Sequence, residues 1–294
     1  MTARVLEYRP LAMADLISTL PSDWLRIFLD LYWFAPPVAL WRAVEARIVA
    51  RQAFVAPMLD LGCGHGRFTT AIFGAHKPIT VGCDLLLKQL VTARDSGAYK
   101  TLTLADGHCL PFPCGVFATA LSNSVLEHIR NPLPVLRESA RALRQGGHLV
   151  ITVPSDRFHS YLAGTKKHQA TGHFGLAAAY NAAVDQQFQH YHYHTPNEWA
   201  RLFQSVGLEL VQEHYYMAPA AAAVWDAMNQ QFGVGRRSVF SILVSPRLRK
   251  MGYQRLVAGV LPRILEKRLR VYYDMDVAPG ETGAGLLLIA EKIA

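Results

Sequence analysis

Three glycines at alternate positions stand between an apolar run and a helical stretch. Gly62, Gly64 and Gly66 follow Met58–Leu61, and a helix is expected over Phe68–Phe73. Glycine permits a tight turn and lets a ligand approach the backbone closely. The start of a helix offers free N–H groups and the positive end of the helix dipole. The segment therefore predicts a ligand-binding turn between a strand and a helix.

The carboxylate of Asp60 limits which ligand suits this turn. The spacing is G-x-G-x-G and not the G-x-G-x-x-G of dinucleotide binders. Asp60 stands two residues before Gly62, at the carboxyl end of the expected strand, where its charge would repel a pyrophosphate. The same carboxylate can pair with the cationic amino group of a methionine moiety.

Two further acids stand where the next two expected strands end. Asp84 ends the second apolar run, and an acid at that place can accept both ribose hydroxyls of a nucleoside. Asp106 follows the third run and can accept from an adenine amino group. Either acid alone is more often a helix cap or a turn residue. Their successive positions after Asp60 favour a nucleoside site.

The elements that position these acids alternate in type. The short apolar runs are Ala56–Leu61, Ile79–Asp84, Thr101–Ala105, Phe117–Asn123 and His148–Val153. Helical stretches separate these runs, and this alternation predicts a parallel sheet. A helix that begins near Asn131 is expected to end at Gln145-Gly146-Gly147, because glycine just past a helix end is a usual stop signal.

In this order the segments resemble the class I S-adenosylmethionine-dependent methyltransferases, in particular the small-molecule subgroup related to ubiquinone and menaquinone biosynthesis. The segments are LDLGCGHGRF, GCDLL, ADGHCLPF, LSNSVLEHIRNPLPVLRESARALRQGGHLVITVP and, more weakly, HYHTPNEWARLFQSVGLELV, together about half of the chain. The resemblance implies an α/β, Rossmann-like fold with a mostly parallel seven-stranded sheet and a final antiparallel strand. It also implies S-adenosyl-L-methionine as the cofactor.

The resemblance further implies roles for single residues. The glycines would form the cofactor loop, the acids would hold the amino group, the ribose and the adenine, and Glu127 and His128 would lie at the mouth of the site. The residues so assigned to the cofactor are Asp60, Gly62, Cys63, Gly64, Gly66, Asp84, Leu85, Asp106, Gly107, His108 and Asn123. Arg130-Asn131 stands where the family often has an Asp soon after its Glu-His-Ile triplet, which changes a loop only.

Alternating histidines raise two further possibilities. His190, His192 and His194 would share one face of an extended strand, and three histidines can bind a metal. The family carries His and Tyr there for packing, so no metal is expected. A general base is needed only if the acceptor must lose a proton, since orientation alone can carry much of the rate. His128, His190, His192 and His194 are all candidates, and we assign His128 and His192 as catalytic.

The chain departs from the simple family pattern late in the sequence. Expected strands at Glu209–Tyr216 and Gly285–Ile293 are separated by 68 residues, where the family usually has a short hairpin. We therefore expect a helical insertion before the last strand. The predicted domains are an N-terminal helical cap (1–52), a methyltransferase core (53–216 and 283–294) and a helical insertion or lid (217–282).

The insertion contains a basic amphipathic segment. Apolar residues recur at three- and four-residue spacing over Gln254–Val271, and Pro262 should kink or split this helix. A basic amphipathic helix can lie on an anionic membrane. The alternative is a lid that packs its apolar side on the core with its arginines in solvent, and we favour the lid.

Composition narrows the class of protein. The chain is 51% hydrophobic and 18% charged, with a net charge of +8, and its four cysteines form no CxxC pair. No signal peptide is visible and no run reaches the roughly 20 apolar residues that span a bilayer, so we expect a cytoplasmic protein, with membrane association through 254–271 as the alternative. We predict a small, hydrophobic acceptor methylated on O or C. A nucleic-acid methyltransferase and a non-catalytic cofactor-binding subunit are the rivals, and the oligomeric state stays open.

Overall fold

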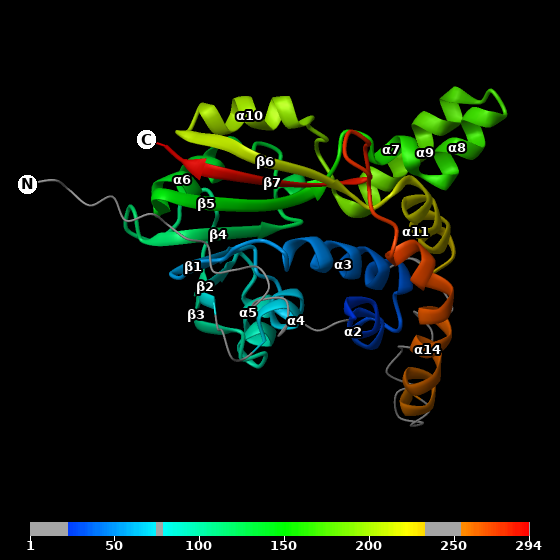
Figure 1. Cartoon of the computed structure of the whole chain (residues 1–294), viewed down its shortest axis with the longest axis horizontal. Coiled ribbons are helices and arrows are strands. Elements are labelled where there is room, and N and C mark those ends of the chain that lie inside the picture. The colour runs from blue at the N-terminus through cyan, green and yellow to red at the C-terminus, as the bar shows by residue number, and fades with distance from the viewer. Residues whose placement is uncertain (1–22, 75–78, 233–253, 294) are drawn as a thin grey trace, which may run out of the picture.

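A seven-stranded sheet forms the centre of the computed structural model, which describes residues 23–74, 79–232 and 254–293, without the side chains of 254–259. The strands are β1 (Met58–Leu61), β2 (Ile79–Asp84), β3 (Tyr99–Leu104), β4 (Phe117–Asn123), β5 (Leu143–Pro154), β6 (Leu208–Tyr216) and β7 (Gly285–Lys292). Their order is β3-β2-β1-β4-β5-β7-β6, and β7 runs antiparallel to both of its neighbours (Figure 1). The predicted fold, with its final antiparallel strand inserted into a parallel sheet, is confirmed.

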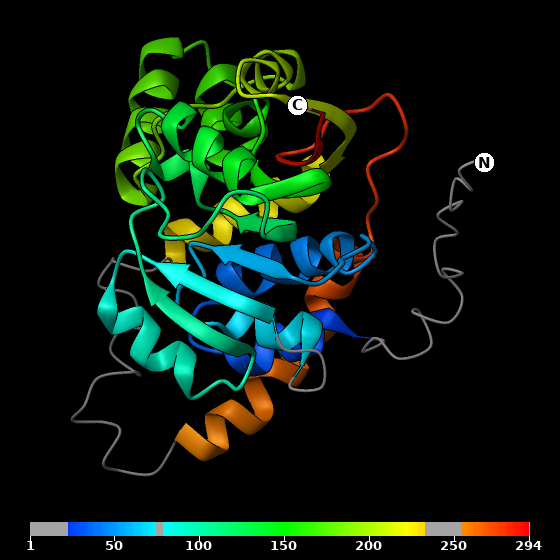
Figure 2. The ribbon, with the colours of Figure 1, turned by 90° about the vertical axis from the view of Figure 1, so that its left-hand side faces the viewer.

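The helices lie on both faces of the sheet and beyond one end of it. They are α2 (Trp24–Leu31), α3 (Pro36–Val49), α4 (Arg67–Phe73), α5 (Leu87–Arg94), the short 3₁₀ helix η1 (Leu126–His128), α6 (Leu133–Ala142), α7 (Phe158–Tyr161), α8 (Ala163–Ala170), α9 (Phe174–Phe188), α10 (Pro196–Gln204), α11 (Pro219–Phe232) and α14 (Gln254–Tyr273). Figures 1 and 2 show α2, α11 and α14 together with α7 to α9 beyond the end where the parallel strands finish.

Two cores, one on each face, hold the sheet. Successive side chains of a strand point to opposite faces, and β7 supplies both cores: Leu286 and Leu288 face α6 and α10, while Leu287 and Ile289 face α2, α3 and α11. All four side chains are buried. Because β7 is buried on both faces, it is apolar along most of its length instead of alternating.

The predicted end of the helix at Gln145-Gly146-Gly147 is wrong. Helix α6 ends at Ala142, and the strand β5 begins at once with the fully buried Leu143, which pairs with Phe117. The pairing then shifts to Thr119 with His148. Gly146 lies within this irregularity at φ +67°. The glycines therefore permit a bulge in a strand, which is another common use of glycine.

Helix α14 continues across Pro262 without splitting, and it docks on α2 and α3. Leu269 and Tyr273 are buried in the core. Arg270 pairs with Asp23 at 2.5 Å, and Glu266 pairs with both Arg270 and Arg26, so part of the basic side serves the docking itself. Within the described ranges, no helix has both the length and the apolar character that crossing a bilayer requires.

Candidate functional site

The glycine turn after β1 has the backbone that only glycine adopts readily. Gly62 and Gly64 have φ of +72° and +53°, in the left-handed region. A β-carbon on Gly62 would lie 2.6 Å from the Val125 side chain, whereas one on Gly64 would meet no atom within 4 Å. The turn thus packs tightly on one side and keeps its other side free for a ligand, at the point where α4 begins.

This free side opens into a cavity of about 650 Å³ at the carboxyl ends of the parallel strands. Of the residues assigned to the cofactor from the sequence, all except Gly66 line it: Asp60, Gly62, Cys63, Gly64, Asp84, Leu85, Asp106, Gly107, His108 and Asn123. Gly66 instead precedes α4, and a β-carbon there would press on Ser96 and Tyr99 at 3.0 Å. Its role in this structure is the packing of the turn against β3 and α5.

Asp60 lies at the floor of this cavity and is only 2% exposed. Its Oδ2 accepts hydrogen bonds from the hydroxyls of Thr69 and Tyr99, each at 2.6 Å. Burial raises the pKa of Asp60 to about 6, in spite of these two hydrogen bonds. Among the residues that the structure describes, no cationic side chain pairs with Asp60, and such a buried carboxylate suits a cationic ligand group, such as an ammonium.

The other two acids shape the loops in which they stand. Asp84 accepts from the backbone N–H groups of Gly64 at 2.9 Å and Leu86 at 2.8 Å. Asp106 accepts from the backbone of His108 at 2.9 Å and pairs with its ring at 2.7 Å, and these hydrogen bonds lower the pKa of Asp106. A carboxylate has about four acceptor positions, so both acids can still accept from a nucleoside.

A buried polar network that the sequence reasoning missed connects α3 to the end of β4. Glu45 is fully buried, and Arg42 donates to it at 2.5 Å. Glu45 also accepts from Ser124 at 2.8 Å, from Asn123 at 3.2 Å and from Tyr216 at 3.0 Å. The amide of Asn123 is thus already engaged, and its other end accepts from a threonine of β5 at 3.0 Å. The network therefore holds Arg42, Asn123 and Ser124, which line the cavity of about 650 Å³, in fixed positions.

The second cavity is smaller, about 120 Å³, and largely aromatic. Its lining comes from α3, η1, α7, α11 and the end of α9: Val38, Trp41, Arg42, Ser124, Glu127, His128, Pro154, Phe158, Phe188, His190 and Trp225. Four of these residues, Val38, Arg42, Ser124 and His128, line the large cavity too. The two cavities therefore adjoin.

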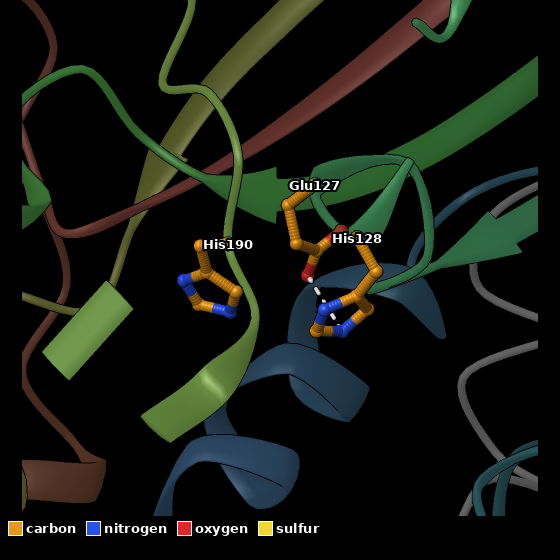
Figure 3. A group of neighbouring side chains, drawn as sticks. All are labelled: Glu127, His128 and His190. Carbon is orange, nitrogen blue, oxygen red and sulfur yellow. Dashed lines mark ion pairs between the residues drawn. The ribbon is translucent and has the colours of Figure 1, made fainter. Parts of the chain in front are cut away.

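Glu127, His128 and His190 gather at the wall of the small cavity (Figure 3). Glu127 was expected at the mouth of the site, but it is 2% exposed and lies inside. Burial raises the pKa of Glu127 to about 8 and lowers the pKa of His190 to about 3. The site thus favours the neutral forms of both groups.

The alternating histidines do not share one environment. His192 and His194 stack on each other with ring centroids 4.6 Å apart and pack on Trp199, while His190 packs on His128. The segment is irregular and not a strand, so the expected common face does not form. His128 lines both cavities and His192 lines neither. The catalytic roles of both residues stay predictions, and the position of His192 adds no support.

The comparison with protein families finds one match over most of this architecture. The profile of the family described as "Methyltransferase domain" matches residues 36–213, more than half of the 294 residues. The matched region runs from α3 into β6 and contains the glycine turn, the three acids and the glutamate–histidine cluster.

Individual relatives match about half of the chain. 27-O-demethylrifamycin SV methyltransferase of Amycolatopsis mediterranei is 30% identical over 153 residues, 48% of this chain and 54% of that protein. The tRNA U34 carboxymethyltransferase of Methylococcus capsulatus is 32% identical over 136 residues, 45% of this chain and 41% of that protein. The chain therefore spans about half the length of the curated relatives it matches.

The fold of this chain is also similar to that of a solved structure. Geranyl diphosphate C-methyltransferase from Streptomyces coelicolor A3(2), in complex with Mg²⁺, geranyl diphosphate and S-adenosyl-L-homocysteine, aligns with a TM-score of 0.53. The alignment covers 87% of this chain and 79% of that chain at 12% identity. At that identity the comparison concerns the fold alone.

Proposed function

This chain belongs to the methyltransferase-domain family, and on that premise we propose that it is an S-adenosylmethionine-dependent enzyme that methylates an oxygen or carbon atom of a small, hydrophobic acceptor. The observation that carries the proposal is the narrow aromatic cavity beside the cofactor cavity. Trp41, Phe158 and Trp225 form much of its wall. A cavity of about 120 Å³ suits a single ring or the end of a chain.

The residues of the large cavity would divide the cofactor among them. Asp60 would hold the cationic amino group, Asp84 the ribose hydroxyls and Asp106 the adenine edge. S-adenosylmethionine, when bound, supplies a methyl group on a sulfonium, which is already a good leaving group. The task left for the protein is to hold an acceptor atom in line with that methyl group, because orientation lowers the barrier strongly.

The border between the cavities would orient the acceptor. Arg42, Ser124 and His128 are polar groups that line both cavities. Ser124 has a φ of +50°, an uncommon conformation for a residue other than glycine, and such strain concentrates at functional sites. Hydrogen bonds to Arg42 at 3.0 Å and to Glu45 at 2.8 Å hold its hydroxyl. These groups would therefore hold an acceptor at a fixed distance from the methyl group.

A nucleic-acid acceptor is the second candidate, because several relatives are named tRNA U34 carboxymethyltransferase and the chain is basic. The chain lacks the Asn/Asp-Pro-Pro-aromatic signature that amino-group nucleic-acid methylators often show after the fourth strand. It has Ser122-Asn123-Ser124-Val125 there. The small aromatic cavity favours the small acceptor.

The first test is calorimetric titration with S-adenosylmethionine and S-adenosylhomocysteine. We expect micromolar binding that is lost in Asp84→Ala and kept in Asp95→Ala, whose carboxylate is exposed and pairs only with the neighbouring Arg94 in the described structure. Transfer of a radioactive methyl group is then screened on hydroxylated aromatic and isoprenoid compounds, with bulk tRNA as a separate arm.

The acceptor proposal has its own control. Trp225→Ala should reduce turnover of a small acceptor while cofactor affinity is unchanged, because Trp225 lines the small cavity only. If tRNA is methylated and none of the small compounds is, the proposal is overturned in favour of a nucleic-acid acceptor. Cofactor binding without any turnover would favour a non-catalytic subunit.

A further inference from the structure

We propose that Glu127, His128 and His190 form a binding site for one divalent transition-metal ion in the wall of the small cavity. The ion would be of the class that imidazole and carboxylate ligands hold together, such as Zn²⁺, Co²⁺ or Fe²⁺. Its open coordination position would face the acceptor, and this role of the ion rests on the proposed function. The metal site itself does not depend on methyl transfer.

The first argument is convergence. Each of the three residues offers one ligand atom, and these atoms all lie within 4.8 Å of one another. In Figure 3 the carboxylate of Glu127 lies beside the ring of His128, with Oε1 4.0 Å from its Nε2. Bonds of about 2.0–2.2 Å to a tetrahedral zinc ion place its ligand atoms about 3.3 Å apart. Side-chain movements of about 1 Å would therefore close the site.

The local backbone brings these residues together from distant parts of the chain. Glu127 and His128 belong to the 3₁₀ turn after β4. Gln189 ends α9 in the left-handed region at φ +58°, which turns the chain and directs His190 back to that 3₁₀ turn. The backbone N–H of Tyr191 donates to the carbonyl of Glu127 at 2.9 Å. The two segments are thus joined beside the proposed ligands.

The second argument is the partner of each Nδ1 atom. Nδ1 of His128 lies 3.3 Å from the carbonyl oxygen of Gln189, which only accepts, so this nitrogen carries the proton. Tyr193 donates its hydroxyl proton to Asp185 at 2.5 Å, and its oxygen therefore accepts from Nδ1 of His190 at 3.1 Å. With Nδ1 protonated in both rings, Nε2 is the nitrogen of each ring that carries the lone pair. Metal-bound histidines usually donate their other N–H to a carbonyl or a similar acceptor.

The third argument is the condition of Glu127. The residue is 2% exposed, and its Oε2 has no hydrogen-bond partner among the residues that the structure describes. The nearby guanidinium of Arg42 pairs with Glu45 instead, at 2.5 Å. A buried polar atom without a partner is costly, and in a native protein it calls for an explanation, of which a bound ion is one. A cation between Glu127 and the two imidazoles would satisfy it.

The ligand set also indicates what the site could do. Two imidazoles and one carboxylate do not suit Mg²⁺ or Ca²⁺, which prefer oxygen ligands. Three protein ligands leave one position open, as in catalytic zinc sites. An acceptor oxygen bound there would be oriented, and its pKa would fall. The proposal therefore narrows the acceptor to a compound with a hydroxyl or enol oxygen.

The test measures metal binding directly on untagged full-length protein treated with a chelator and dialysed. Co²⁺ is followed through its visible absorption and Zn²⁺ by calorimetry, without cofactor or acceptor. We expect one equivalent to bind to the wild type, with affinity reduced at least about tenfold in Glu127→Gln and in His190→Gln. Tyr193→Phe, which removes the acceptor for Nδ1 of His190, should also weaken binding by about tenfold.

His148→Gln is the matched control, because His148 lies 3.7 Å from Glu291 in another histidine–glutamate pair away from both cavities. It should bind metal like the wild type. The proposal is overturned if folded wild type, checked by circular dichroism, binds neither ion. It is also overturned if His190→Gln keeps the wild-type affinity and stoichiometry. Loss of metal binding would leave the methyl-transfer proposal intact, and absence of methyl transfer would leave this result intact.

Discussion

Gly62 and Gly97 share a left-handed backbone but differ in their surroundings. Their φ angles are +72° and +70°, yet a β-carbon would lie 2.6 Å from Val125 at Gly62 and would meet nothing within 4 Å at Gly97. Gly97→Ala should cost roughly 1–2 kcal/mol of unfolding free energy from the backbone alone. Gly62→Ala should cost about 1–3 kcal/mol more through overpacking. Denaturant unfolding measures both.

The same pair of variants separates folding from binding. S-adenosylhomocysteine affinity should fall in Gly62→Ala, because Gly62 lines the large cavity and Gly97 does not. The measurement is calorimetry under conditions in which both variants are folded. Equal losses of stability and of affinity in the two variants would contradict the argument that close contact with Val125 requires glycine at Gly62.

The ionisation of Asp60 predicts how cofactor affinity depends on pH. Burial raises the pKa of Asp60 to about 6, so the carboxylate that would pair with the amino group is mostly protonated at pH 5. Affinity for S-adenosylhomocysteine should therefore rise up to about tenfold per pH unit below pH 6 and level off above about pH 7. Asp60→Asn should bind weakly at every pH from 5 to 7.5, while Asp95→Asn should follow the wild type.

The free energy of unfolding follows the opposite course. The raised pKa means that the protonated Asp60 stabilises the folded state fully below its unfolded pKa of about 3.9. This contribution is lost as the pH rises through about 6.

The affinity for S-adenosylhomocysteine tests the contact itself. Wild-type affinity that is flat between pH 5 and pH 7 would contradict the proposed contact between Asp60 and the amino group.

Single residues were predictable where the motif was local, and less so where the fold brings distant groups together. The three acids and most of the glycine turn were predicted and line the cavity. Glu45 was missed, because a charged residue in an apolar helix is normally predicted to lie on the exposed side of that helix. The spacing of Arg42 and Glu45, three residues apart, was the available signal. The sequence could not show that His190 lies close to Glu127, because the two residues are more than sixty positions apart in the chain.

The same limit applies to the strands. Most of the expected runs match the strands to within two residues. For β1, β4 and β7 the reason is that strands buried on both faces are apolar along most of their length. The third strand begins at Tyr99 and not at Thr101, and the Tyr99 hydroxyl is one of the two donors to Asp60. The beginning of β5 was missed since its Gly146-Gly147 pair resembles a helix end. Pairing with β4, which a local pattern does not reveal, decides the outcome there.

The docking of α14 on α2 and α3 predicts unequal effects of two neighbouring truncations. Leu269 is 4% exposed within the core and Val271 is 57% exposed on the same helix. Leu269→Ala should lower the unfolding free energy by about 2–5 kcal/mol through the lost contacts and the cavity left behind. Val271→Ala should change it by less than about 0.5 kcal/mol. Denaturant unfolding followed by fluorescence would check this, and equal effects would mean that α14 does not dock as described.

At the scale of the molecule, the position of α14 bears on membrane contact through 254–271. Its buried side already packs on the protein, and the exposed part of the described side chains mixes Val260, Ile264 and Val271 with three cationic residues. We expect the protein to stay unbound in a flotation assay with neutral vesicles and with anionic phosphatidylglycerol vesicles at physiological salt. Flotation with the anionic vesicles alone would instead support membrane contact through this helix.

Because β7 lies between β5 and β6 in the sheet, both of these strands are synthesised before the strand that pairs with them. Both neighbours leave the ribosome before it, and 68 residues separate Tyr216 from Gly285. At about 5–20 residues per second, the edge of β6 waits roughly 3–14 s for β7, and the edge of β5, which ends at Pro154, waits about twice as long. Unpaired strand edges recruit other chains. A pause in translation within residues 217–284 would lengthen this exposure, so the yield of folded protein should depend on codon choice in that stretch.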